Sequence, residues 1–471
     1  MFEEEFNSPD FGEIIELIQQ YEAAMQTNTA PHFDEESFEK IILYYQDNRE
    51  FKKAMNVIDS AIEQFPFSGE FLLKKAEVFA EQNRLDDALE FIGYAEVLDP
   101  SDVRIALTRA DILLFKGEHE AALAEIENGF NLAESDADRC ELFLEKADVF
   151  EDKERYAEVI ESLQQALHFE PENEEALNRL WFAYELTERY DNSIAFHKAL
   201  IETMPYNHLA WFNLGHAYAG KQDWNNAQDA FEYVVAIKEE FDAGYICIAD
   251  VLFMKEEYAT ALNFYHEAIK IGKPQKELYL KTGECYEKVN DIPKARNFIR
   301  KAIAIDPHYA EAFYLLGETY KKEENWSQAI SAYERAVKLS KENIDYLLGL
   351  ADACLQIEDI DKAVALFEQI LETDSKFKGH WINLAAAYYE LEDYEAAFAL
   401  LKEAEVKFEG EADIIYIKAV FYYQAGIKHE AILSLEKALM LNFDLHTIIF
   451  ELFEELKDDA VILQVIEQYR D

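Results

Sequence analysis

A cysteine, a histidine and an aspartate near the middle of the chain are the residues whose types could perform covalent chemistry. Cys247 could supply a thiol nucleophile, His216 a base that deprotonates it, and Asp250 a carboxylate. No HExxH, GxSxG or GxxxxGK[ST] sequence accompanies them, and no histidine has the spacing of a metal site. We therefore predict a protein that is not an enzyme and has no cofactor or metal, with a thiol-dependent enzyme centred on Cys247 as an alternative.

Charge is the second feature with chemical consequences. The chain has 96 Asp and Glu against 44 Lys and Arg, a formal charge of −52, which opposes binding to nucleic acid and to anionic membranes. There is no uninterrupted apolar run of about 18 residues that could span a bilayer. The acidic start, Met1 to Glu5, is unlike a secretory leader, and the four cysteines show no disulfide spacing. We expect a cytoplasmic protein without membrane insertion.

A repeat of 34 residues must position these side chains. Pro66 and Pro100 are 34 residues apart, as are Pro171 and Pro205, and the grid slips once, by 3 residues, between 129 and 140. Apolar residues recur at positions 4, 7, 8 and 11 and again at 20, 24 and 27, which is the spacing of two amphipathic helices in each repeat. The twelve predicted repeats start at Glu35, Gly69, Val103, Cys140, Glu174, His208, Asp242, Lys276, Ala310, Ile344, Lys378 and Ala412.

The repeat pattern resembles the tetratricopeptide repeat (TPR). The sixth repeat shows its signature in full: Trp211, Leu214, Gly215, Tyr218, Ala227 and Phe231. The resemblance implies an all-α fold, a right-handed solenoid of stacked antiparallel helix pairs over residues 35–445. We expect an acidic segment and a capping helix (11–26) within residues 1–34, and two capping helices, 446–457 and 459–470, within 446–471. Trp181 at position 8 and the slip at 129–140 predict an irregularity within 129–207, and a hinge is one form that it could take.

The resemblance also implies a concave groove lined by positions 2, 5, 6, 9, 12 and 13 of the first helices. Position 9 is acidic in seven repeats, and we call these residues the acidic ladder: Glu77, Asp111, Asp148, Asp250, Glu284, Glu318 and Asp352. Carboxylates along a cleft reinforce one another and would attract a basic segment. The alternative is a solvated face on a protein that is acidic everywhere.

Repeats five to seven carry a mixed stripe of apolar and polar side chains at these groove positions. The candidate contacts are Asn178, Arg179, Phe182, Phe212, Asn213, His216, Ile246, Asp250 and Phe253, with Asn383 further along. Asn213 and Asn383 at position 6 resemble the family's asparagine contacts to a peptide backbone, since an amide both donates and accepts. Alternatively, Phe212 and Phe253 pack between neighbouring repeats. The lysine and asparagine pattern with which some family members clamp chaperone C-termini is absent.

One stretch departs from the general acidity. Residues 267–341 hold 14 Lys and Arg against 11 Asp and Glu, whereas the first 50 residues hold 2 against 13. This stretch could be a second contact surface, a contact to another copy, or a solvated patch. We predict a non-enzymatic adaptor or scaffold that binds a basic or amphipathic segment of a partner protein. The alternative is a self-assembling structural scaffold, so that a homo-oligomer is possible but not predicted.

Overall fold

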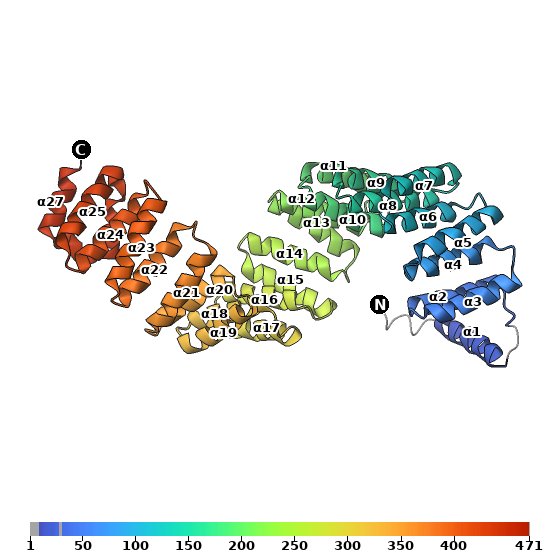
Figure 1. Ribbon diagram of the computed structural model, residues 1–471, viewed down its shortest axis with the longest axis horizontal. Coiled ribbons are helices and arrows are strands. Elements are labelled where there is room, and N and C mark those ends of the chain that lie inside the picture. The colour runs from blue at the N-terminus through green and yellow to red at the C-terminus, as the bar shows by residue number, and fades with distance from the viewer. Residues whose placement is uncertain (1–8, 28–30, 471) are drawn as a thin grey trace. The chain divides into compact units, whose positions relative to one another are not determined.

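Paired helices make up the protein in the computed structural model, which describes residues 9–27 and 31–470 (Figure 1). Over these ranges there is no β-strand, so the predicted all-α solenoid class is confirmed. The first helices of the twelve repeats are α2 (Glu35–Asp47), α4 (Gly69–Glu81), α6 (Val103–Phe115), α8 (Asp136–Asp152), α10 (Glu174–Leu186), α12 (His208–Gly220), α14 (Asp242–Met254), α16 (Lys276–Lys288), α18 (Ala310–Lys321), α20 (Ile344–Gln356), α22 (Lys378–Glu390) and α24 (Ala412–Gln424).

Each first helix is followed by an antiparallel second helix. The second helices are α3 (Phe51–Gln64), α5 (Leu85–Leu98), α7 (His119–Leu132), α9 (Tyr156–Phe169), α11 (Tyr190–Thr203), α13 (Trp224–Ile237), α15 (Tyr258–Ile271), α17 (Ile292–Ile305), α19 (Trp326–Leu339), α21 (Ile360–Thr373), α23 (Tyr394–Lys407) and α25 (Lys428–Leu441). The chain forms two compact bodies, an N-terminal body (Met1–Glu239) and a C-terminal body (Glu240–Asp471).

The same backbone turn ends every first helix. The residue at position 15 has a positive φ in all twelve repeats: Arg49, Asn83, Gly117, Glu154, Glu188, Gln222, Glu256, Asn290, Glu324, Glu358, Glu392 and Gly426. In the first repeat the amide of Arg49 donates to the carbonyl of Gln46 (2.8 Å), and that of Glu50 to Tyr45 (2.8 Å). This pair of bonds is a Schellman motif, which satisfies the last carbonyls of the helix and reverses the chain.

Small residues at position 8 let the two helices of a repeat approach closely. In the sixth repeat a Cβ added to Gly215 would lie 2.5 Å from a ring carbon of Phe231, and in the ninth a Cβ on Gly317 would lie 2.5 Å from Tyr333. Both rings are almost completely buried, so they have little room to move aside. The glycine and the facing ring at position 24 therefore form one packing unit.

Alanine at Gly215 should destabilise the N-terminal body by about 1 kcal/mol or more, because overpacking against Phe231 exceeds the gain in helix propensity. The matched control is Gly93→Ala in α5, where an added Cβ meets nothing within 4 Å. That substitution should stabilise by about 0.5–1 kcal/mol. Urea unfolding of both variants measures the difference, and shifts of the same sign would contradict the packing argument.

The slip in the repeat grid lengthens a single helix. α8 has 17 residues, against 13 in most of the other first helices, and it begins with a capping box in which the Ser135 side chain and the Asp138 side chain each accept from the other's amide. α8 packs against α7 and α9 and also touches α6, so the stack continues through the insertion. The division into bodies falls at residues 239 and 240 instead. The longer α8 is itself an irregularity within 129–207. In the fifth repeat, moreover, α10 packs mainly against α9 and α12 and only weakly against α11, its own second helix. A hinge within 129–207 stays a prediction.

The ends of the repeat array are covered differently from one another. At the start, α1 (Pro9–Gln26) buries Ile18 and Tyr21 against α2 and α3; residues 1–8 of the predicted acidic segment lie outside the described residues. At the other end, the predicted helix 446–457 is instead split into η2 (Phe443–Thr447), α26 (Ile448–Leu452) and η3 (Glu454–Asp458), followed by α27 (Ala460–Gln468). Phe453 has an extended backbone (φ −149°), which interrupts this predicted helix. The short elements cover the apolar end of α24 and α25.

Candidate functional site

The first helices of neighbouring repeats lie against one another within each body. In the N-terminal body α4 contacts α6, α6 contacts α8, and α10 contacts α12; in the C-terminal body α16 contacts α18 and α18 contacts α20. The second helices of neighbouring repeats are further apart. First helices therefore form the shorter, inner face of each body, and positions 6 and 9 lie on these helices.

Four carboxyl groups interact along the inner face of the N-terminal body. Three belong to the acidic ladder: Glu77, Asp111 and Asp148. The fourth, Glu145 on α8, was missed by the sequence analysis, although it stands at position 6 of the predicted stripe. Burial, together with the charges of Asp111 and Asp148, raises the pKa of Glu145 to about 8. Burial and the charge of Glu77 likewise raise the pKa of Asp111.

One carboxyl oxygen of Glu145 lacks a hydrogen bond. Its Oε1 is buried and has no hydrogen-bond partner. An unpaired buried oxygen beside two further carboxyl groups is unfavourable for folding, and it marks a place where negative charge is poorly compensated. We call Glu77, Asp111, Glu145 and Asp148 the inner acidic surface.

Arg179 borders this surface, and its charge is already used within the chain. The guanidinium forms ion pairs with Asp148, with Glu151 (3.1 Å) and with Glu175 (3.1 Å). Its predicted neighbours in the stripe are open to solvent: Asn178 is exposed, and the side chain of Phe182 is 47% exposed. Arg179 therefore partly neutralises one end of the inner acidic surface, and its guanidinium is already paired with carboxylates of the same chain.

Asn213 does not occupy the exposed position that was predicted for it. It is 1% exposed, and its Nδ2 donates to the carbonyl of Leu177 (2.8 Å) and faces Nε2 of His197 (3.3 Å). His197 is fully buried, and its Nδ1 bonds to the carbonyl of Ser193 (2.8 Å). This network joins α10, α11 and α12. The Asn213 side chain is thus a structural group, and the prediction that it contacts a partner is corrected.

The aromatic residues of the predicted stripe are partly packed. The Phe212 ring lies 4.5 Å from that of His216, 5.8 Å from Phe231 and 6.5 Å from Trp181, measured between centroids. Burial lowers the pKa of His216 to about 4, so it is neutral at pH 7. The contact between Phe212 and Trp181 joins neighbouring repeats, which agrees with the alternative interpretation that Phe212 packs between repeats.

In the C-terminal body, acidic residues at position 9 are held by tyrosines of the second helices. Tyr265 donates to Asp250 (2.7 Å), and Tyr333 donates to Glu318 (2.5 Å). Lys281 forms an ion pair with Asp250 (2.5 Å), and Lys321 lies 3.9 Å from Asp352. Lysines of the same body thus balance Asp250 and Asp352. On the inner acidic surface Glu77 is paired with Lys74 (2.8 Å) and Asp148 with Arg179, whereas Asp111 and Glu145 make no ion pair among the described residues.

The remaining predicted residues of the C-terminal body differ in exposure. Ile246 and Phe253 are half-buried, and the Phe253 ring packs against Tyr258 (5.1 Å). Asn383 is exposed. Burial raises the pKa of Glu284, and the charge of Glu311 adds to this.

The proposed thiol chemistry gains no support from the surroundings of Cys247. Burial and the charge of Asp250 raise the pKa of this thiol, which disfavours the nucleophilic thiolate. His216 belongs to the N-terminal body, whereas Cys247 and Asp250 belong to the C-terminal body. Throughout residues 9–27 and 31–470 no group of three or more His, Cys, Asp or Glu side chains is arranged to hold a metal ion.

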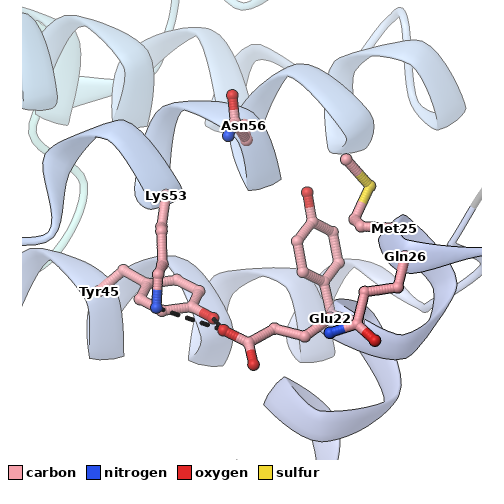
Figure 2. A pocket seen from close by; sticks show the side chains of 7 residues that line it. Glu22, Met25, Gln26, Tyr45, Lys53 and Asn56 are labelled. Carbon is pink, nitrogen blue, oxygen red and sulfur yellow. Dashed lines mark hydrogen bonds and ion pairs between the residues drawn. The ribbon is translucent and has the colours of Figure 1, made fainter.

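Pockets recur on the other side of the first helices, over a tyrosine at position 11. They lie at Tyr45, where α1, α2 and α3 line the pocket, at Tyr184, where α9, α10 and α11 line it, and at Tyr320, where α18 and α19 line it. The pocket of about 300 Å³ at Tyr45 is bounded by α1, α2 and α3 (Figure 2). Here Glu22 accepts from the Tyr45 hydroxyl (3.1 Å) and from Lys53 (3.3 Å), so the polar groups satisfy one another.

Comparison with known proteins identifies the family. Three family models described as tetratricopeptide repeat match residues 40–103, 277–309 and 321–388. The chain belongs to the tetratricopeptide repeat proteins, as its repeats predicted. Such repeats stack into extended surfaces, and this fold suggests a scaffold for protein–protein interaction.

Several solved structures resemble parts of the chain. The MamA protein has 21% sequence identity and a TM-score of 0.34, covering 36% of this chain and 92% of its own. YrrB, described as a TPR protein with an unusual peptide-binding site, has 15% identity and a TM-score of 0.33, covering 38% and 93%. The APC/C hetero-tetramer Cut9–Hcn1 has 16% identity and a TM-score of 0.40, covering 93% and 97%. No curated protein matches the chain.

Among the described helices, none has the length and apolar character needed to cross a membrane.

Proposed function

We propose that this protein is a scaffold that binds a basic, amphipathic segment of a partner protein on the inner acidic surface of its N-terminal body. The observation that carries the proposal is the buried, unpartnered Oε1 of Glu145 beside Asp111 and Asp148. A lysine or arginine from a partner would pair with Asp111 and with the carboxylate that forms when Glu145 loses its proton. The exposed ring of Phe182, at position 9 of the next repeat, offers an apolar contact to such a segment.

Binding of a cation here should be coupled to the release of a proton. Glu145 is largely protonated at pH 7 because its pKa lies near 8, and a nearby cation favours its ionised form. Asp111 and Asp148 oppose ionisation, whereas Arg179 favours it. Since the partner binds the ionised form better, affinity should rise as the pH increases through about 8.

A labelled amphipathic peptide of lysine and leucine tests this proposal by fluorescence anisotropy. Affinity for the full chain should increase about fivefold or more from pH 6.5 to pH 8.5, and should fall at least tenfold from 50 to 500 mM NaCl. The double variant Glu145→Gln/Asp111→Asn should bind more weakly and lose most of the pH dependence. It should also be at least as stable as the parent protein, because two poorly compensated acids have been removed.

The matched control removes the same two charges from second helices of the same body. Asp229 on α13 and Glu202 on α11 are exposed, and Asp229→Asn/Glu202→Gln should leave the affinity within twofold. If the control weakened binding as much as the inner variant, net charge alone would explain the attraction. A salt-independent affinity would also contradict the proposal.

A further inference from the structure

A second surface, on the α17–α19 side of the C-terminal body, has the opposite chemistry. It surrounds a pocket of about 390 Å³, which is lined by Phe313, Leu316, Tyr320, Gln328, Ser331, Ala332 and Arg335. The first three residues belong to α18 and the others to α19. Pockets of about 300–1,000 Å³ with mixed apolar and polar walls are typical of binding sites.

Cations without acidic partners border this pocket. The guanidinium of Arg335 lies 5.6 Å from the centre of the Phe313 ring. Arg300 on α17 donates to the hydroxyl of Tyr320 (2.8 Å). Neither arginine has an ion-pair partner within the described residues, although the chain contains more than twice as many acidic as basic residues.

The preceding repeat shows the same arrangement. Lys301 stands 34 residues before Arg335, at the same repeat position, and its Nζ lies 5.4 Å from the Tyr279 ring and 4.3 Å from the Phe298 ring. It too makes no ion pair among the residues that the structure describes. By contrast, Lys437 at this position of the last repeat is paired with Glu405 (2.5 Å). The unpaired cations are therefore specific to this part of the protein, and cation–π contacts hold them beside aromatic rings.

The local field is positive in spite of the net charge. The pKa of His266 is lowered by burial and also by the charges of Lys301 and Lys294; the charge of Glu267, which is paired with Lys270 (3.2 Å), opposes this shift. The acidic groups nearby are engaged by other cations: Asp291 by Lys294 (2.8 Å) and Glu323 by Arg296 (2.5 Å). Arg300, Lys301 and Arg335 thus remain available for carboxylates from outside. We call these three residues together with the pocket the outer basic surface.

We propose that the outer basic surface binds an acidic segment of a partner protein, whose aromatic or aliphatic side chain enters the pocket while its carboxylates pair with Arg300, Lys301 and Arg335. The pocket favours a protein over a nucleic acid, because Phe313 and Leu316 provide an apolar anchor site. A long polyanion would also be repelled by a chain of charge −52. A short segment experiences mainly the field within a Debye length, about 8 Å at physiological salt.

The test measures binding of a labelled peptide, Glu-Glu-Asp-Phe-Glu-Asp-Glu-Glu, to the full chain by fluorescence anisotropy. Lys301→Gln/Arg335→Gln should weaken binding at least tenfold. Lys376→Gln/Lys402→Gln removes the same charge from exposed lysines of the same body and should change affinity less than twofold. Replacing the peptide's phenylalanine with serine should weaken binding at least fivefold, because the pocket would stay unfilled.

A second variant keeps the proposal testable if loss of the cations affects folding. Ser331→Trp fills the pocket from an exposed position on α19 and leaves the cations in place; it should also abolish peptide binding. The lysine–leucine peptide should bind all these variants as it binds the parent protein, which separates the two surfaces. Equal losses with the control pair, unchanged binding to Ser331→Trp, or tighter binding of oligo(dT) than of the acidic peptide would each overturn the proposal.

Discussion

Replacing Asn213 with alanine should destabilise the N-terminal body by about 2–3 kcal/mol. The substitution leaves Nε2 of His197 buried without a donor and removes the bond to the Leu177 carbonyl. It also leaves a cavity where the amide was packed. The effect should appear as faster amide hydrogen exchange in α10, α11 and α12, measured helix by helix with mass spectrometry.

Asn383 provides a close control for this prediction. It is the same residue type at the same repeat position, but its side chain is exposed. Asn383→Ala should therefore change stability by less than about 0.5 kcal/mol. Similar losses in both variants would mean that asparagine at position 6 has a general role in the repeat, and the network around His197 would not be the cause.

Acid should destabilise the same body through His197. Burial lowers the pKa of His197 to about 4 in the folded protein, against about 6.5 in the unfolded chain. The unfolded state binds the additional proton between these values, so stability is complete above about pH 6.5 and is lost as the pH falls towards 4. The loss from His197 alone approaches about 3 kcal/mol, since each pKa unit corresponds to about 1.4 kcal/mol.

The geometry explains why protonation is unfavourable. In the neutral ring Nδ1 donates to the Ser193 carbonyl, and Nε2 accepts from Asn213. A protonated Nε2 would face the Asn213 amide as a second donor. His216, whose pKa is also lowered to about 4 by burial, acts in the same direction.

Urea unfolding at pH 7 and pH 4.5 tests this prediction. His197→Gln should reduce the difference in stability between the two pH values, because glutamine does not titrate. His32 is exposed, and His32→Gln should leave the difference unchanged. The raised pKa of Glu145 works in the opposite direction, so the comparison is made between variants and not from the parent protein alone. An unchanged pH dependence in His197→Gln would show that His197 is not the titrating group.

The helix pairs and their order follow from local information in the sequence. In eleven repeats the first helix begins at the residue where the repeat starts; in the fourth, α8 begins at Asp136, four residues before Cys140. The apolar spacing that defines each helix lies within 14 residues, and the turn at position 15 recurs in every repeat. Short-range patterns of this kind predict the helices from the sequence alone, because they do not depend on which other helix packs against them.

The roles of individual polar residues depend on neighbours from other helices. Asn213 and Asn383 have the same repeat position, yet only Asn213 is buried. Sixteen residues before Asn213 stands His197, which can accept its amide; sixteen residues before Asn383 stands Phe367, whose ring offers no such partner. Arg179 is likewise paired with Asp148 and Glu151, which lie on the preceding first helix.

By itself, the sequence determined the period, the two helices of each repeat and the excess of acidic groups on the first helices, because each of these is a property of spacing and composition. The tertiary structure alone decided which charges remain uncompensated. Oε1 of Glu145 has no hydrogen-bond partner, and Arg179 is paired with Asp148. Lys301 and Arg335 lie beside aromatic rings, and Arg300 donates to the Tyr320 hydroxyl. Whether a charge is paired depends on atoms brought together from different helices, often about one repeat apart, and the linear pattern does not specify these distances.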